Sequence, residues 1–259
     1  MKSIFTLSII LTLLLISCSS PTDTKDKNTP SETIKVATWN IQIFGQSKLS
    51  DTTTMSVIKQ VCSEFDLIAI QEIRSKEQDV IPTLIDSLGN GWSYVISRRL
   101  GRTQSKEQYA FVYNENVFLI DTFQTTDPLD QIHREPFGAT FEISNKEYTF
   151  LNVHTDPDEE EIESYYLDTL ARLHNAILCG DFNRHPERYS NDYFFEEYNY
   201  SLEVNEFTNI AESQSYDNFL FIKPMYYKGT IYNFRDSLTL SESVTKDVSD
   251  HYPVYIQIK

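Results

Sequence analysis

From residue 34 onward, the apolar and polar positions predict strands interleaved with helices. Residues 34–42 alternate enough to predict a strand, and apolar residues then recur at helical spacing after Asp51, a suitable helix N-cap. Residues 67–72 read as a buried strand, and residues 79–88 as a second helix. This order of strand, helix, strand and helix predicts an α/β domain.

The middle of the chain predicts antiparallel strands. Residues 107–113 and 117–120 suggest a hairpin across a short polar turn, and residues 137–143 and 148–153 suggest a second pair. An amphipathic helix over residues 162–173 then leads to another apolar strand.

Many of these apolar segments begin or end at a polar side chain that can bind a metal, accept a proton or hold a phosphate. The residues are Asn40, Glu72, His154, Asp181, Asn183, Asp217, Asp250 and His251. Taken singly, Asp181 suits an ordinary turn and Glu72 a surface boundary. Together, two histidines with carboxylates and amides are what metal-assisted cleavage of a phosphodiester requires.

The N-terminal segment predicts export. An apolar run over residues 4–16 follows Lys2 and is too short for a permanent membrane span, so residues 1–17 read as a signal peptide. The run ends in Leu15-Ile16-Ser17-Cys18, which resembles a bacterial lipobox and predicts lipidation of Cys18. The alternative is an ordinary secretory signal with an incidental cysteine.

Residues 18–33 hold no large apolar residue and read as a flexible tether, which leaves residues 34–259 as the catalytic domain. We expect an exported protein that is lipid-anchored in the bacterial cell envelope, at the outer membrane or cell surface, or released from it. Its contact with a membrane would be through that anchor alone.

The composition counts against a general polyanion binder, because the formal net charge is -16 and the chain has no basic tail. Residues 98–106 reverse this balance locally with Arg98, Arg99, Arg102 and Lys106, which suggests a phosphate-contacting loop or else a merely solvated one. Cys62 and Cys179 stand in apolar contexts and predict buried thiols rather than a disulfide.

Several motifs occur in the order that one known family has, over nearly the whole domain. They are Trp39-Asn40-Ile41-Gln42-Ile43-Phe44-Gly45, Ile70-Gln71-Glu72-Ile73-Arg74, Leu100-Gly101-Arg102, Lys106-Glu107-Gln108-Tyr109, Arg134-Glu135-Pro136, Asn152-Val153-His154, Gly180-Asp181-Phe182-Asn183, Tyr216-Asp217 and Ser249-Asp250-His251-Tyr252-Pro253-Val254. The chain thus resembles the endonuclease/exonuclease/phosphatase superfamily, and within it the deoxyribonuclease I family. The resemblance implies a four-layer α/β/β/α sandwich of two packed mixed β-sheets flanked by helices.

The resemblance also implies roles for the strand-end residues. His154 with Glu107, and His251 with Asp217, would form two hydrogen-bonded acid–base pairs, although which histidine is the acid stays open. The metal site would hold Mg²⁺, or Mn²⁺ in its place, on Glu72, Asp250 and Asn40. Asp181 and Asn183 would orient water and phosphate. The implied reaction is hydrolysis of DNA with little sequence specificity, leaving 5′-phosphate and 3′-hydroxyl ends.

For substrate contact, the resemblance points to Arg74, Arg102 and Arg134 as DNA-binding residues. Two departures weaken binding to duplex DNA: Ser105 replaces the usual tyrosine, and Asn218 replaces a basic residue. We therefore expect lower duplex affinity with the cleavage chemistry retained.

Asp127, Asp130 and Glu135 fall where the family has a loop that binds structural Ca²⁺. An ordinary acidic turn explains these residues equally well.

The other polar and aromatic clusters predict ordinary structure. His133, His174 and His185 suit surface or helix-end positions, and the acidic run over residues 156–163 suits a solvated helix start. The aromatic run over residues 189–200 could stack on bases, but core packing is the more common role.

Two other functions remain open. The same scaffold serves phosphodiesterases and phosphatases acting on lipid or sugar phosphates, such as sphingomyelinases, and a non-catalytic surface lipoprotein could use it to bind a partner. A monomer is our expectation.

Overall fold

The structure, a computed structural model, describes residues 33–185, 197–202 and 206–259, and within them it forms two six-stranded β-sheets. The first sheet has the strand order β11-β12-β1-β2-β4-β3. Its strands are β1 (Ile34–Phe44), β2 (Leu67–Ile73), β3 (Trp92–Ile96), β4 (Gln108–Asn114), β11 (Gly229–Ile231) and β12 (Val254–Ile258). Because β1 and β2 run parallel while their other neighbours run antiparallel, this sheet is mixed.

The second sheet has the order β5-β6-β7-β8-β10-β9. Its strands are β5 (Phe118–Gln124), β6 (Phe137–Ile143), β7 (Lys146–His154), β8 (Ile177–Asp181), β9 (Tyr198–Tyr200) and β10 (Asp217–Ile222). Here β7 and β8 are the parallel pair, and β10 returns antiparallel to β8. The predicted pairing of β6 with β7 is confirmed.

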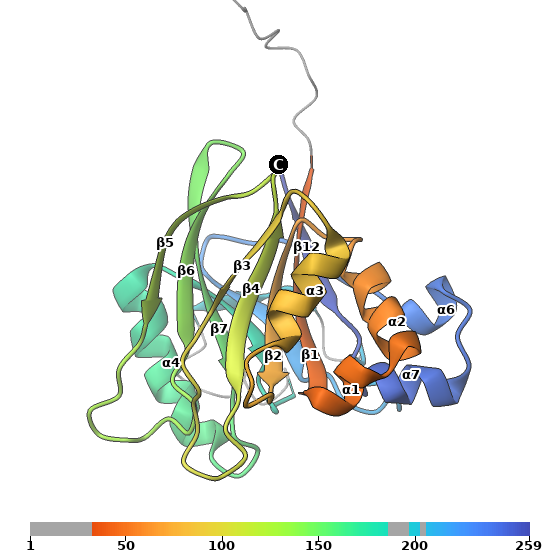
Figure 1. Cartoon of the computed structure of the whole chain (residues 1–259). Coiled ribbons are helices and arrows are strands. Elements are labelled where there is room, and N and C mark those ends of the chain that lie inside the picture. The colour runs from red at the N-terminus through yellow and green to blue at the C-terminus, as the bar shows by residue number, and fades with distance from the viewer. Residues whose placement is uncertain (1–32, 186–196, 203–205) are drawn as a thin grey trace, which may run out of the picture. The chain divides into compact units, whose positions relative to one another are not determined.

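Helices cover the outer face of each sheet (Figure 1). Those on the first sheet are α1 (Gln46–Ser50), α2 (Thr52–Cys62), α3 (Val80–Leu88), α6 (Phe234–Ser237) and α7 (Glu242–Val248), and α4 (Glu160–His174) covers the second. One apolar core lies between the sheets and one lies under each helical layer. The predicted four-layer α/β/β/α sandwich is therefore confirmed.

Local signals set several element boundaries as expected. The Asp51 carboxylate accepts hydrogen bonds from the backbone N–H groups of Thr53 and Thr54, which fixes the start of α2. Cys62 and Cys179 are buried free thiols, as predicted. In the described part of the chain, no helix is both long enough and apolar enough to cross a membrane.

The predicted hairpin between residues 107–113 and 117–120 is wrong. β4 pairs with β2 on one side and β3 on the other, so it offers no edge to a further strand. The turn at residues 114–116 instead carries the chain into the second sheet, where β5 pairs with β6. A short polar turn suits either outcome, and the long-range pairing of β4 decides between them.

Candidate active site

The candidate site lies at the end of the two sheets where β1, β2, β7 and β8 finish and where β4 and β10 begin. In the second sheet, the strand register pairs His154 with Asp181 and Asp181 with Asp217, so three titratable residues stand on adjacent strands. In the first sheet, the register places Asn40 beside Gln71, the residue before Glu72. Parallel strands thus gather the predicted strand-end residues at one edge.

Two histidines are each held by a buried carboxylate. His154 Nδ1 lies 2.7 Å from Glu107 Oε1, and His251 Nδ1 lies 2.7 Å from Asp217 Oδ2. Both imidazoles turn Nε2 toward Asp181, whose Oδ2 lies 3.7 Å from each. The three residues therefore enclose a small polar space with two ring nitrogens and one carboxylate oxygen facing it.

Burial and charge oppose each other in this cluster. Burial disfavours the charged imidazole, but the charge of Glu107 and its hydrogen bond raise the pKa of His154. Burial acts against His251 as well, yet Asp217 and Asp181 raise its pKa to about 10. Burial would raise the pKa of Asp181, but the two histidines lower it. The charged forms of the two imidazoles and of Asp181 thus stabilise one another against the effect of burial.

The two carboxylates behind the histidines differ. Burial works against ionisation of Glu107, but His154, Arg134 and Arg74 together lower its pKa. For Asp217, burial and the nearby charge of Asp181 prevail over His251 and raise its pKa.

Asn40 connects this cluster to Glu72. Its Nδ2 lies 3.3 Å from Glu72 Oε1 and 3.0 Å from Asp181 Oδ2, and it donates to both. The Oδ1 atom of Asn40 is buried and has no hydrogen-bond partner. Glu72 Oε2 accepts from the Ile43 N–H and pairs with Arg74. Because Mg²⁺ prefers oxygen ligands, the Glu72 carboxylate and the unpaired oxygen of Asn40 are the candidate ligands for a divalent cation.

Asp250 stands on the other side of the site. Its Oδ2 accepts a hydrogen bond from Gln42 Nε2 over 2.9 Å, and its Oδ1 lies 3.7 Å from His251 Nε2. The structure thus brings the predicted ligand Asp250 next to the histidine cluster, while Asn40 and Glu72 are in direct contact with each other.

A second group with metal-binding spacing was not anticipated. Among the described residues, ligand atoms of Asp181, Asp217 and His251 lie within 4.8 Å of one another. Asp217 Oδ2 already accepts a hydrogen bond from Thr208 Oγ1 over 2.7 Å as well as contacting His251. A metal ion here would compete with the acid–base pair, so Asn40 and Glu72 are the better-suited ligands.

Asn183 supports Asp181 from the following turn. It has a left-handed φ of 46°, its backbone N–H donates to Asp181 Oδ1 over 2.8 Å, and its Nδ2 donates to the Thr155 carbonyl. Asn183 therefore fixes the turn that follows Asp181.

The three predicted DNA-binding arginines occupy different settings. Arg74 lies at the site, with Nη2 3.0 Å from Glu72 Oε2 and 3.6 Å from Glu107 Oε2. Arg102 lies on the neighbouring loop and forms ion pairs with Asp130 and Glu159.

The setting of Arg134 corrects the prediction that it contacts DNA. This side chain is only 9% exposed, and its guanidinium donates to the carbonyls of His154 and Thr155 and lies 3.1 Å from Glu107 Oε1. It therefore supports the His154–Glu107 pair from beneath.

The predicted calcium ligands are not gathered. Asp127 accepts hydrogen bonds from the backbone N–H groups of Leu129 and Ile132. Asp130 pairs with Arg102, and Glu135 pairs with Arg98 over 2.6 Å. Since each carboxylate turns to a different partner, an acidic turn describes this segment better than a calcium loop.

Asn218 and Glu163 are both buried polar residues. Asn218 is 1% exposed, and its Oδ1 accepts from Ser201 and from neighbouring backbone N–H groups, so it faces the interior rather than DNA. Glu163 is buried where a solvated helix start was expected, and it accepts from the backbone N–H groups of His133 and Asp156. Burial raises the pKa of Glu163 to about 7.

The remaining histidines have ordinary structural settings. His133 Nδ1 lies 3.0 Å from Asp156 Oδ2, and His174 closes α4 and stacks on Phe123. His185 is partly buried. Of the aromatic run, residues 189–196 lie outside the described residues, whereas Tyr198 is buried in the core under α4, as expected.

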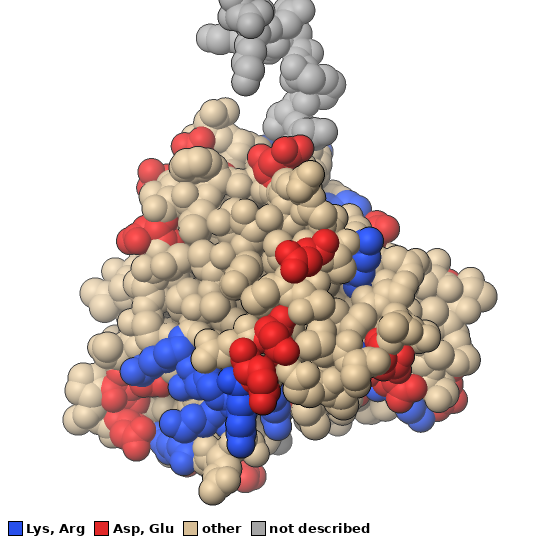
Figure 2. Space-filling model, viewed as in Figure 1, with Lys and Arg blue, Asp and Glu red and all other residues tan. Residues whose placement is uncertain are grey.

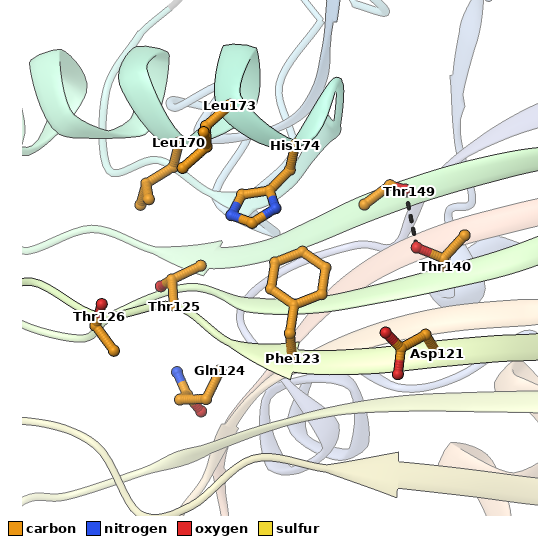
Figure 3. Close-up of a pocket in the computed structure, with 10 residues that line it drawn as sticks. All are labelled: Asp121, Phe123, Gln124, Thr125, Thr126, Thr140, Thr149, Leu170, Leu173 and His174. Atoms are coloured by element: carbon orange, nitrogen blue, oxygen red, sulfur yellow. Dashed lines mark hydrogen bonds between the residues drawn. The ribbon is translucent and has the colours of Figure 1, made fainter.

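Two surface hollows differ in chemistry. One of about 760 Å³ lies on the second sheet beside α4 and is lined by Phe123, His174 and a hydrogen-bonded Thr140–Thr149 pair (Figure 3). The other has a volume of about 640 Å³ and is lined by Lys76, Arg99, Arg102 and Lys106 together with Thr103 and Gln104. We call it the basic hollow. Figure 2 shows Lys and Arg gathered at the lower left of the molecule in the view of Figure 1. The basic hollow includes the loop that leads into Glu107, so it suits a phosphate chain approaching the site.

Comparison with known proteins identifies the family to which the chain belongs. Residues 37–236 match the model of the Endonuclease/Exonuclease/phosphatase family. Deoxyribonuclease-1 of Homo sapiens is 27% identical over 263 residues, covering 87% of this chain and 92% of that protein. Deoxyribonuclease gamma of Rattus norvegicus is 29% identical, with 87% and 84% coverage. The crystal structure of D. rerio TDP2 complexed with single strand DNA product superposes with a TM-score of 0.60 at 12% identity, covering 87% of this chain and 98% of that one.

Proposed function

Since the chain belongs to the endonuclease/exonuclease/phosphatase family, we propose that it is a divalent-metal-dependent endonuclease that cleaves DNA with little sequence specificity. The observation that carries the proposal is the pair of carboxylate-held histidines whose Nε2 atoms both lie 3.7 Å from Asp181 Oδ2. Positioned groups that accept a proton from water and give one to the leaving oxygen accelerate hydrolysis of a phosphodiester.

In the proposed reaction, a water oxygen attacks phosphorus in line with the P–O3′ bond, which breaks as the new P–O bond forms. A group at the His154, Asp181 and His251 cluster takes the proton of the water, and one imidazole Nε2 gives a proton to the departing 3′ oxygen. The products are a 5′-phosphate and a 3′-hydroxyl. Glu107 and Asp217 hold each imidazole with Nδ1 occupied, so that Nε2 faces the reacting groups.

A divalent cation would be held by Glu72 and by the unpaired Oδ1 of Asn40, with Asp250 on the far side of the site. Mg²⁺ is the natural choice for such oxygen donors, and Mn²⁺ could replace it. When bound, the ion supplies positive charge that stabilises the developing negative charge on the phosphate.

DNA is the substrate that fits best. Arg74 at the site and the basic hollow provide positive charge in an otherwise acidic protein, and such contacts recognise the sugar-phosphate backbone rather than base identity. The relatives named above are deoxyribonucleases, and the related D. rerio structure holds a DNA product.

We also propose export and lipid anchoring at Cys18, which lies outside the described residues. The tether would join the domain at Ile34, at the end of β1 opposite to Asn40.

The test is nicking of supercoiled plasmid by residues 31–259, which form one compact unit. We expect nicking in Mg²⁺ that stops on addition of EDTA and is lost in His154→Ala. The matched control is His174→Ala, because that histidine stacks on Phe123 away from the site and its loss should leave nicking unchanged. A folded protein without nicking activity would contradict the proposal, and assays with sphingomyelin and inositol phosphates would then follow.

A further inference from the structure

Arg99 joins two loops that the sheet itself does not align. Its Nη1 donates to the backbone carbonyl of Ser75 over 2.6 Å and contacts the carbonyl of Arg74 at 3.4 Å. Its Nη2 donates to the carbonyl of Lys106 over 2.5 Å. One planar guanidinium therefore connects the loop after β2 to the loop before β4.

These two loops carry opposite sides of the candidate site. The loop after β2 begins just beyond Glu72 and contains Arg74, and the loop before β4 ends in Glu107. Arg74 Nη2 lies 3.0 Å from Glu72 Oε2 and 3.6 Å from Glu107 Oε2, so it stands between the proposed metal ligand and the acid–base pair. The position of the Arg74 backbone thus affects both groups.

The pairing of β2 with β4 stops short of these two loops. The pairing of β2 with β4 shifts register between Ile70 and Ile73, and its last pair is Ile73 with Gln108. Arg74 and Glu107 lie just beyond that pair. Glu72 itself has a left-handed φ of 60°, so the strand leaves regular geometry before the loop begins. Backbone hydrogen bonds tie Arg74 to Phe44 and Glu107 to Leu100, and Arg99 adds a side-chain link between the two loops themselves.

Arg98 offers a matched comparison. It is the preceding residue in the same basic segment and carries the same charge, but its Nη2 lies 2.6 Å from Glu135 Oε1 and its side chain is 59% exposed. Removal of either arginine subtracts one positive charge from this face, whereas only Arg99 contacts the carbonyls of the two loops. The pair can therefore separate charge from geometry.

We propose that Arg99 is a positioning residue, which holds Arg74 and Glu107 in register and so aligns the metal ligand with the acid–base pair. The inference rests on the proposed nuclease function. Lysine cannot replace Arg99, because a single ammonium group lacks the planar fork that reaches carbonyls on two loops at once.

The experiment compares Arg99→Ala, Arg99→Lys and Arg98→Ala in residues 31–259, with kcat and KM for nicking measured separately. Since a misplacement of about 1 Å can cost about 100-fold, we expect both Arg99 variants to lose roughly tenfold or more in kcat. Arg99→Lys keeps the positive charge of the basic hollow and should leave KM unchanged, whereas Arg99→Ala should also raise KM. Arg98→Ala should change mainly KM and its salt dependence. Equal effects of Arg98→Ala and Arg99→Ala, or full activity in Arg99→Lys, would overturn the proposal.

A second measurement does not depend on the reaction. The amide of Arg74 donates to the Phe44 carbonyl and that of Glu107 donates to the Leu100 carbonyl. Hydrogen exchange of these two amides should be faster in Arg99→Ala than in Arg98→Ala, with thermal unfolding confirming that both variants are folded. An inactive wild-type protein that shows this difference would sink the nuclease proposal but keep Arg99 as the link between the loops, and unchanged exchange would remove that link.

Discussion

Gln71 Nε2 donates a hydrogen bond to Asn152 Oδ1 over 2.7 Å, and this contact joins the two sheets directly. Gln71 belongs to β2 and Asn152 to β7, and both side chains are fully buried. Asn152 also donates to the carbonyls of Ile70 and Ala110 in the first sheet. Because Glu72 follows Gln71 and His154 lies two residues after Asn152, this amide pair sets how the two halves of the site face each other.

The first prediction concerns this link. Asn152→Ala removes three buried hydrogen bonds: the one from Gln71, whose amide keeps Thr38 and the Ala69 carbonyl as acceptors, and those to the Ile70 and Ala110 carbonyls. We therefore expect it to lower the free energy of unfolding by about 2–4 kcal/mol. Urea denaturation measures the loss. Asn116→Ala is the control, since Asn116 donates to Asp66 at an exposed position and its removal should cost well under about 1 kcal/mol. Equal losses in the two variants would contradict the structural role of Asn152.

The sequence predicted the strand-end residues well because their chemistry and position are both local signals. Asp181 and His154 each follow an apolar run, and parallel strands bring such ends together. The partner of each strand was less predictable: the turn at residues 114–116 looked like a hairpin, and only the pairing of β4 with both β2 and β3 shows that β5 belongs elsewhere.

Buried polar residues marked the limit of sequence reasoning. Arg134, Glu163 and Asn218 each have a side chain that usually meets water, so their burial was not expected from the sequence. Their burial depends on acceptors and donors from distant segments, such as the His154 carbonyl for Arg134. No period or spacing in the chain encodes those contacts.

The second prediction is a pH effect. Glu107→Gln removes the charge that raises the pKa of His154 against the effect of burial, so the pKa of His154 should fall. NMR titration of the imidazole and the matching limb of the kcat–pH profile should both move to lower pH. Glu135→Gln, which removes a carboxylate paired with Arg98 outside the histidine cluster, should leave both unchanged.

The third prediction concerns stability at alkaline pH. Burial disfavours the charged form of His251, but Asp217 and Asp181 raise its pKa to about 10. This is above the value of about 6.5 expected in the unfolded chain. Its stabilising contribution is thus complete below about pH 6.5 and declines as pH rises toward about 10. Between these limits, the Tm of the wild-type protein should fall more than that of His251→Gln. Parallel Tm curves would show that this histidine is not held in its charged form.

The fourth prediction concerns the metal. If Glu72 and Asn40 hold Mg²⁺, then Mg²⁺ at about 100 times its Kd should stabilise the wild-type protein by about 2.7 kcal/mol. Glu72→Gln should lose most of this gain, because the neutral amide is a weaker ligand than the carboxylate. Asp130→Asn removes an equal charge from a surface pair with Arg102 and should retain it. Calorimetry with and without EDTA gives the measurement, and an undiminished gain in Glu72→Gln would place the ion elsewhere.

The fifth prediction separates two positions that the sequence treated alike. Ser105 is exposed on the loop of the basic hollow, where its backbone N–H donates to Thr103 Oγ1. Ser105→Tyr would add a ring that can pack on a sugar or base, an interaction worth about 1–3 kcal/mol, and should tighten duplex binding by roughly fivefold or more. Fluorescence anisotropy in the His154→Ala background measures this Kd without cleavage.

Asn218→Arg should act in the opposite way. The Asn218 Oδ1 atom accepts hydrogen bonds from Ser201, Leu202 and Phe219 in a buried setting, so an arginine there leaves those donors unpaired and buries a charge. We expect a lower Tm and no gain in DNA affinity from this change. Tighter binding by Asn218→Arg with an unchanged Tm would mean that this part of β10 faces the substrate, whereas tighter binding by Ser105→Tyr alone assigns duplex affinity to the loop beside Arg102.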